Sequence, residues 1–228
     1  MQIRLLASVL LVLACSACGS NDEPYKPAPA WSGRKPSLPA PPALESKPLK
    51  QGDAYTVYGA VHTLRSRIHE KDIAGKEVTI EGYIVASNIE DAPACAVHPV
   101  GKADPEGCKS EVPGFYIADG KADDPNAPRI RVLGWAKNFA TVYDAMKEYK
   151  GKTSKPEKPI QDDMFTVDVP FPLPAVGAKV RIKGTYGFTF NKLTTGTVSD
   201  PKNGLLTYIS MEVIEQAPAP ASFKNGKI

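Results

Sequence analysis

Five stretches of the chain alternate between apolar and polar residues, which is the pattern of β-strands with one buried face. They cover residues 76–87, 114–119, 129–135, 179–190 and 205–215. In the first stretch, "KEVTIEGYIVAS", Val78, Ile80 and Ile84 fall on one side. The fourth stretch, "KVRIKGTYGFTF", places five apolar side chains on one face: Val180, Ile182, Tyr186, Phe188 and Phe190. These patterns predict a mainly β domain.

Two segments show helical spacing instead. In "NFATVYDAMKEYKG" apolar residues recur every three or four positions: Phe139, Val142, Tyr143, Met146 and Tyr149. Asn138 is suited to the N-cap and Gly151 to the C-terminal stop, so we predict a helix over residues 138–150. A second amphipathic segment, at 61–71, has one apolar face formed by Val61, Leu64 and Ile68. The predicted order is a helix, three strands, a helix and two strands.

This order resembles that of the OB fold, a five-stranded Greek-key barrel with a helix between its third and fourth strands. The phrases "AGKEVTIEGYIV" and "VGAKVRIKGTYGF" are similar to the GxxVxVxG openings of the first and fourth OB strands. Gly82 and Gly184 lie inside strand patterns, where small barrels need bends or bulges. The resemblance covers residues 73–215 and implies an OB-like barrel, with a long insertion at 152–178 before the fourth strand. A fold of this kind says little about function.

The first residues, "MQIRLLASVLLVLACSACGSND", contain an uncharged apolar run at 5–14. This run is shorter than the roughly 20 residues of a membrane span and has the length of a signal-peptide core. The small residues before cysteine resemble the lipobox of bacterial lipoproteins, in which a cysteine is acylated and becomes the new N-terminus. The residues before Cys15 fit that pattern better, whereas processing at Cys18 leaves no stray thiol in an oxidising compartment. We expect a signal peptide over 1–17 and lipidation of Cys18, with Cys15 as the alternative.

The next residues predict where the folded domain is held. Gly19 follows Cys18, at a position where an aspartate would imply retention in the inner membrane, so the resemblance implies an envelope protein that favours the outer membrane.

Eight of the 22 prolines fall within residues 23–50, where no periodic apolar pattern exists. Proline favours extended chain, so we expect residues 18–51 to form a tether of up to about 100 Å. A folded domain over 52–216 and a loose tail over 217–228 complete the predicted organisation.

Cys95 and Cys108 bracket the stretch "CAVHPVGKADPEGC", in the predicted loop between the first two strands. In an exported protein, two cysteines in one long loop indicate a disulfide. Structural zinc needs four ligands, and His98 is the one further candidate in this stretch. A redox switch is another alternative. We predict a disulfide, no bound metal and a solvent-exposed His98.

Sequence signatures of catalysis are missing. The chain has no G-x-S-x-G, H-E-x-x-H, phosphate-binding glycine loop or Rossmann fingerprint. The acidic stretch "DGKADDPN" has Lys121 at a ligand position of a calcium loop and lacks the terminal glutamate. We therefore expect neither an enzyme nor a cofactor.

OB barrels commonly bind ligands on the face of their second and third strands. The resemblance places five candidate ligand-binding residues there: Phe115, Tyr116, Arg129, Arg131 and Trp135. Some of these aromatic residues could equally belong to the core. Aromatic rings beside arginines suit bases, sugars or peptides, but export and a net charge of only +3 argue against nucleic acid.

We therefore expect an envelope glycan, peptide or protein partner, besides the membrane that holds the lipid anchor. The alternative is a structural or assembly role. In that case the apolar, proline-interrupted insertion at 152–178 is the interface, unless it wraps the barrel and completes the core.

Overall fold

The computed structural model describes residues 47–122, 124, 126–191 and 196–224. The predicted signal peptide, Cys15 and Cys18, and nearly all of the predicted tether lie outside these residues. The described chain is mainly β, as predicted, with a seven-stranded mixed sheet and three α-helices.

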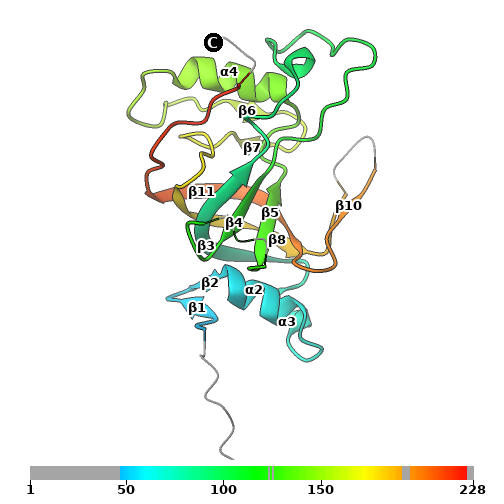
Figure 1. Ribbon diagram of the computed structural model, residues 1–228, viewed down its shortest axis with the longest axis vertical. Coiled ribbons are helices and arrows are strands. Elements are labelled where there is room, and N and C mark those ends of the chain that lie inside the picture. Colours follow the sequence, from blue (N-terminus) through cyan, green and yellow to red (C-terminus); the bar gives the residue numbers. More distant parts are fainter. Residues whose placement is uncertain (1–46, 123, 125, 192–195, 225–228) are drawn as a thin grey trace, which may run out of the picture. The chain divides into compact units, whose positions relative to one another are not determined.

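Five strands of the sheet close into a ring (Figure 1). They are β3 (Lys76–Ser87), β4 (Phe115–Ala118), β5 (Arg129–Leu133), β8 (Lys179–Gly187) and β11 (Leu205–Glu215). The order around the ring is β3-β4-β5-β11-β8, and β8 pairs again with β3. Neighbouring strands are antiparallel except β5 and β11, which run parallel. Each strand lies within one of the five predicted stretches.

The fourth predicted strand is shorter than its alternation suggests. β8 ends at Gly187, and β9 (Thr189–Phe190) pairs with β10 (Val198–Ser199) in a separate two-stranded sheet. The earlier apolar residues of the stretch join the core of the ring, whereas Phe190 packs in a second apolar cluster. The apolar alternation in the sequence continues through Phe190 because β8 and β9 each have one buried face, although they belong to different sheets.

Gly184 allows β8 and β11 to approach each other closely. A Cβ atom added at Gly184 would lie 2.4 Å from the carbonyl oxygen of Thr207. The register of the two strands shifts between Tyr208 and Ser210, beside this glycine, as expected for a bulge. Gly82 has a similar role, since a Cβ atom added there would lie 2.9 Å from the carbonyl oxygen of Ala118 in β4.

Two helices, α2 (Val57–Leu64) and α3 (Glu70–Ile73), lie at one end of the ring (Figure 1). The sequence predicted one amphipathic segment over 61–71, but the chain turns between the two helices. Ile68 lies in this turn with 72% of its surface exposed, so its predicted place on the apolar face is wrong. The other two residues of that face are buried.

Two short strands that the sequence did not predict extend the sheet beside β3. They are β1 (Lys50–Gln51) and β2 (Ala54–Thr56). β2 leads into α2. The first backbone N–H groups of this helix donate hydrogen bonds to the carboxylate of Asp119 and to the Thr56 hydroxyl. Such caps satisfy N–H groups that have no partner within the helix. The first residue of the acidic "DGKADDPN" stretch is thus a helix cap.

The third helix, α4 (Phe139–Tyr149), covers the opposite end of the ring (Figure 1). Asn138 caps it as predicted, since its side-chain oxygen accepts a backbone N–H of the first turn at 3.0 Å. The chain leaves the helix through Gly151, whose φ of 74° favours glycine. Within the predicted apolar face Val142 is fully buried, whereas Met146 is partly exposed because it borders a cavity.

The insertion at 152–178 wraps the ring and completes its core. Its two short strands, β6 (Gln161–Asp162) and β7 (Val167–Asp168), form a hairpin. Three of its large apolar side chains are buried: Phe165, Val169 and Leu173. A second apolar cluster on the outside of the ring contains Leu133, Phe165, Phe190 and Leu205. Of the two alternatives for the insertion, these contacts favour wrapping.

The segment after β11 packs against the domain as far as Lys224, although we expected a loose tail. Phe223 is buried and meets Phe139 of α4 edge to face, with ring centroids 6.4 Å apart. The Lys224 ammonium pairs with Asp91 at 2.8 Å. Residues 216–224 therefore run as a strap from the end of the ring to α4, and we call them the C-terminal strap.

Candidate ligand-binding sites

Three of the five predicted ligand-binding residues form a cluster on the outer face of the ring. Tyr116 on β4 lies opposite Arg131 on β5. The guanidinium carbons of Arg129 and Arg131 lie 4.7 and 5.8 Å from the centre of the Tyr116 ring. Both distances are typical of cation–π contacts. The structure thus brings these three side chains together on a partly exposed surface, which we call the outer-face cluster.

Arg131 is already engaged by the loop that follows the disulfide. Its Nη2 donates to Glu111 Oε2 at 2.8 Å, and only 20% of its side chain is exposed. A ligand that stacked on Tyr116 or paired with Arg131 would have to replace contacts within the chain. In the outer-face cluster Arg131 Nη2 is therefore already paired, whereas the buried Nε of the same side chain has no hydrogen-bond partner.

Phe115 and Trp135 do not belong to this surface. Both side chains are 0% exposed, and their ring centroids lie 6.3 Å apart in the core. Phe115 precedes Tyr116 on β4, and successive side chains of a strand point to opposite faces. The structure therefore places these two candidates in the core, which is the alternative that the sequence left open.

The outer face beyond Arg131 is covered by the chain itself. Leu133 on β5 and its neighbour Leu205 on β11 are 1% and 2% exposed. Phe165 from the insertion and Phe190 from β9 cover them, with ring centroids 5.7 Å apart. The part of the face that is open to a ligand is thus reduced to the outer-face cluster.

The loop between β3 and β4 is closed by a disulfide between Cys95 and Cys108, as predicted. Inside it, His98 Nε2 lies 2.9 Å from Asp104 Oδ1, and its Nδ1 lies 3.0 Å from the carbonyl oxygen of Pro99. The Pro99 carbonyl and then the Asp104 carboxylate raise the pKa of His98, because both favour the protonated ring. The His98 side chain is 15% exposed, so it is half-buried where we expected full exposure.

The described ranges contain no group of three or more His, Cys, Asp or Glu side chains arranged to hold a metal ion. His98 therefore has a carboxylate and a carbonyl as its neighbours, and no set of metal ligands surrounds it there.

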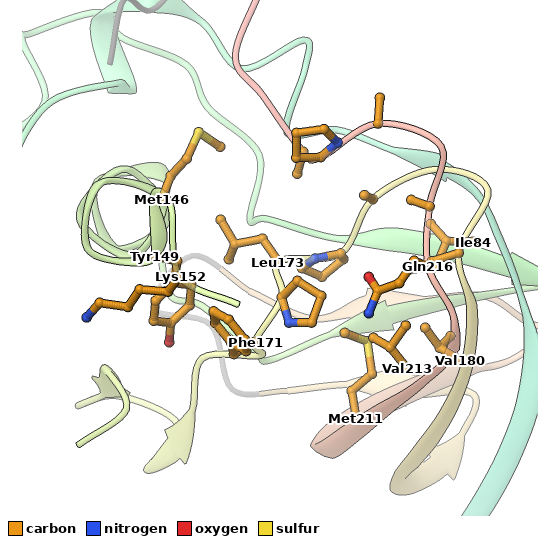
Figure 2. Close-up of a pocket in the computed structure, with 18 of the residues that line it drawn as sticks. Ile84, Met146, Tyr149, Lys152, Phe171, Leu173, Val180, Met211, Val213 and Gln216 are labelled. Atoms are coloured by element: carbon orange, nitrogen blue, oxygen red, sulfur yellow. The ribbon is translucent and has the colours of Figure 1, made fainter. Parts of the chain in front are cut away.

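An apolar cavity of about 520 Å³ lies between the ring and α4 (Figure 2). Its volume falls within the usual range for ligand pockets. Four parts of the chain form its walls: the ring, α4 with the turn after it, the insertion and the C-terminal strap. The side chains labelled in Figure 2 are Ile84, Met146, Tyr149, Lys152, Phe171, Leu173, Val180, Met211, Val213 and Gln216.

The walls of this cavity offer few hydrogen-bonding groups. Of its 20 lining residues, four have polar side chains: Tyr149, Lys150, Lys152 and Gln216. The Tyr149 hydroxyl donates to the carbonyl oxygen of Val169 at 3.1 Å, and burial raises its pKa. None of the lining residues is Ser, Thr, Cys, His, Asp or Glu. The cavity therefore suits an apolar group, and Tyr149 and the two lysines are the titratable side chains among its lining residues.

Met146 and Met211 line the cavity from different walls, one on α4 and the other on β11 (Figure 2). Both are only partly buried. Methionine is flexible and polarisable, so it adapts to apolar partners of different shapes. These two side chains give the cavity walls that can adjust to a ligand.

A smaller recess of about 310 Å³ adjoins the cavity. Phe171 and Met211 line both spaces. The other walls of the recess include Lys155, Asp168 and Ser210, so it is more polar than the cavity. Lys155 Nζ pairs with Asp168 Oδ2 at 3.2 Å.

The sequence patterns did not reveal the cavity, because its walls come from segments far apart in the chain. Met146 and Met211 each occupy ordinary apolar positions of a helix and a strand. The one usable signal is the stretch at 164–174, "MFTVDVPFPLP", which is too long and too apolar for a simple connection. That signal indicates buried contacts but does not identify a space between them.

No protein-family model matches this chain, and no curated protein matches its sequence. No helix among the described residues combines the length and the apolar character needed to cross a membrane.

Proposed function

We propose that this chain is a lipid-anchored envelope protein whose OB-like domain binds a ligand through the apolar cavity, without catalysing a reaction. The observation that carries this proposal is the cavity itself. It is of ligand size, and its walls converge from four segments. Its lining has the adaptable methionines of a binding surface and contains no Ser, Thr, Cys, His, Asp or Glu side chain.

The ring of strands supports the OB-like assignment. Numbered along the chain, its five strands are arranged as first, second, third, fifth and fourth, and the fourth pairs again with the first. The third and fifth strands are parallel, and α4 lies between the third and fourth in sequence. This connectivity agrees with a five-stranded Greek-key barrel.

Export and anchoring are supported by two features. The N-terminal segment resembles a lipoprotein signal with Cys18, or Cys15, as the acylated residue. The disulfide between Cys95 and Cys108 is of a kind that persists in oxidising compartments. Gly19 after Cys18 favours the outer membrane over the inner membrane.

The cavity favours an apolar ligand group over a glycan. A sugar has many hydroxyl groups, and burying them without hydrogen-bond partners is unfavourable. The outer-face cluster of Tyr116, Arg129 and Arg131 could contact a polar part of the same partner, although Arg131 already pairs with Glu111. An assembly role through the insertion at 152–178 has less support, because Phe165, Val169 and Leu173 are buried. Three further apolar side chains of the insertion, Ile160, Val167 and Phe171, pack partly buried against the core.

The proposal is tested by titrating the protein with Nile red, an uncharged dye that fluoresces in apolar sites. The full chain carries Cys15→Ser and Cys18→Ser, because an acyl group would itself take up the dye. We expect saturable binding of about one dye per chain. In Val213→Trp the larger side chain fills the cavity and should weaken binding about tenfold, equivalent to about 1.4 kcal/mol.

Ile214→Trp is the matched control, because Ile214 is the next residue of β11, is 43% exposed and does not line the cavity. Ala217→Phe fills the same cavity from the C-terminal strap, and it replaces Val213→Trp if that variant does not fold. Equal dye affinity in the cavity-filling variant and in Ile214→Trp would overturn the proposal.

A further inference from the structure

We infer that the ligand is a single-chain amphiphile, whose acyl chain occupies the cavity and whose head group is anionic. This inference rests on the proposed function, since it names the class of ligand for the same cavity. Three features of the described residues carry it. The cavity walls have few hydrogen-bonding groups, residues 147–158 beside the cavity are positively charged, and a polar recess adjoins the cavity.

The walls favour an acyl chain over a peptide. A peptide segment brings backbone N–H and C=O groups that need partners when buried. Three lining residues, Pro172, Pro174 and Pro220, have no backbone N–H to donate. Around them the lining consists mostly of alanine, valine, leucine and methionine side chains. An acyl chain has no polar groups along its length, so it gives up no hydrogen bonds to water when it enters such a space.

The last turn of α4 and the segment after it carry an excess of positive charge, which favours an anionic head group. Residues 147–158, "KEYKGKTSKPEK", contain five lysines and two glutamates, a formal excess of three positive charges. Two of these lysines, Lys150 and Lys152, are among the residues that line the cavity. Lys152 also pairs with Glu148, so its charge is partly compensated within the helix turn. When Asp168, which pairs with Lys155, is included, the formal excess falls to two positive charges (five lysines against three carboxylates), and this excess favours an anion.

The adjoining recess offers space for a polar group. Lys155 supplies an ammonium there, and Thr166 and Ser210 supply hydroxyl groups. Asp168 also lines the recess, but its carboxylate is paired with Lys155 at 3.2 Å. Because Phe171 and Met211 line both spaces, a head group in the recess and a chain in the cavity can belong to one molecule.

The cavity is a partly open space with walls on several sides, which suits one bound molecule better than a bilayer surface. The C-terminal strap lines one side through Ala217, Pro220 and Ala221, and the insertion lines another through Leu173. Phe223 and Lys224 hold the far end of the strap against the domain. We therefore assign the ligand as a monomeric amphiphile that has left a membrane or micelle.

The test is displacement of Nile red from the full chain with Cys15→Ser and Cys18→Ser. The competitors have the same chain and different heads: laurate, lauryl alcohol and lauryl trimethylammonium, all below their micelle-forming concentrations. We expect laurate to displace the dye about fivefold better than the alcohol, and the cation to be the weakest. In Lys150→Gln/Lys152→Gln the advantage of laurate over the alcohol should fall at least twofold, because only Lys155 of the recess remains, while the affinity for the alcohol stays the same.

The control is Lys71→Gln/Lys183→Gln, which removes two charges from exposed lysines that line neither the cavity nor the recess. Lys183, like Lys152, pairs with a glutamate, so each double variant removes a lysine from a lysine–glutamate pair. This control should keep the preference for laurate.

Each contrary result has a distinct meaning. Equal displacement by all three competitors would overturn the anionic head group and leave the apolar cavity as a binding site. Displacement by an acetylated Leu-Ala-Leu amide but by none of the amphiphiles would overturn the acyl ligand in favour of a protein segment. Binding of laurate only in vesicles of anionic phospholipid would show surface association and overturn the monomeric ligand. Absence of Nile red binding would contradict the proposed function itself.

Discussion

Glu81 is a buried carboxylate on the outer face of β3, with 7% of its side chain exposed. It accepts hydrogen bonds from Lys179 at 2.7 Å and Arg181 at 2.9 Å, both on β8. The hydrogen bond from Lys179, followed by that from Arg181, lowers the pKa of Glu81. Because the pKa is depressed in the folded state, the stabilisation is present above the unfolded pKa of about 4.5 and is lost as pH falls through the folded pKa.

We predict that Glu81→Gln lowers the free energy of unfolding by about 2 kcal/mol at neutral pH, because it leaves two cations beside a neutral amide. Glu77→Gln is the control, since Glu77 lies on the same strand, is 58% exposed and pairs with Lys183 of β8. We expect it to cost less than about 1 kcal/mol. Urea unfolding measures both, and the Glu81 effect should shrink as pH falls below about 4.5. Equal losses in the two variants would contradict this account of burial.

At the scale of elements, the disulfide fastens a long loop that contains little regular structure. The loop between β3 and β4 contains one short 3₁₀ turn, η2 (Ala94–Ala96). Val100 N–H donates to Asp144 of α4 at 3.2 Å, so the closed loop also touches the helix. Cross-linking two residues 13 positions apart restricts the unfolded chain.

We predict that Cys95→Ala/Cys108→Ala lowers the free energy of unfolding by about 3 kcal/mol, from the loop-closure entropy of the unfolded state. Denaturant unfolding of the non-reduced wild type and of the double variant measures the difference. The wild type with a reductant should lose a similar amount, whereas the double variant should be insensitive to the reductant. A reductant effect of the same size in the double variant would refute this role of the disulfide.

The packing of α4 gives a second test at this scale. Val142 is 0% exposed in the core, whereas Met146 is partly exposed at the cavity. An unpaired charge in a fully buried site is costly, but a charge beside a cavity can keep part of its hydration. We predict that Val142→Asp prevents folding or costs more than about 4 kcal/mol, and that Met146→Asp costs about 2 kcal/mol. Thermal unfolding compares them, and the reverse order would mean that α4 packs through another face.

The five strands of the ring and α4 could be predicted because each has a local pattern: alternation for the strands, and apolar spacing with Asn138 and Gly151 at the ends for the helix. Element boundaries depended on tertiary contacts. The chain leaves β8 at Gly187 and turns at Ile68, although the apolar pattern continues through both positions. A run of alternating apolar residues looks the same whether all of them pack in one core or the last of them, such as Phe190, pack in a second cluster.

At the scale of the whole molecule, the candidate site was the least predictable part. The resemblance pointed to the outer face, where Tyr116, Arg129 and Arg131 meet, but it could not show that Phe165 and Phe190 cover the rest of that face. The cavity exists because separate segments pack around a space without filling it. A sequence pattern records which residues are apolar, and it does not record how completely their packing fills the interior.

The whole molecule combines a predicted lipid anchor with a domain that contains an apolar cavity. If the predicted lipid anchor holds the domain at a membrane, an acyl ligand for the cavity would come from that membrane. We therefore expect an apolar ligand to enter the space between the ring and α4.

Methyl NMR of the full chain, with Cys15→Ser, Cys18→Ser and ¹³C-labelled methionine methyl groups, tests that claim most directly. Met146 and Met211 line the cavity from two walls, and Met164 lies outside it with 43% of its surface exposed, which makes it an internal control. We predict that laurate shifts the signals of Met146 and Met211 together, saturably and with one dissociation constant, while the Met164 signal stays in place. Saturable binding that shifts Met164 alone, or that leaves both Met146 and Met211 unchanged, would contradict it.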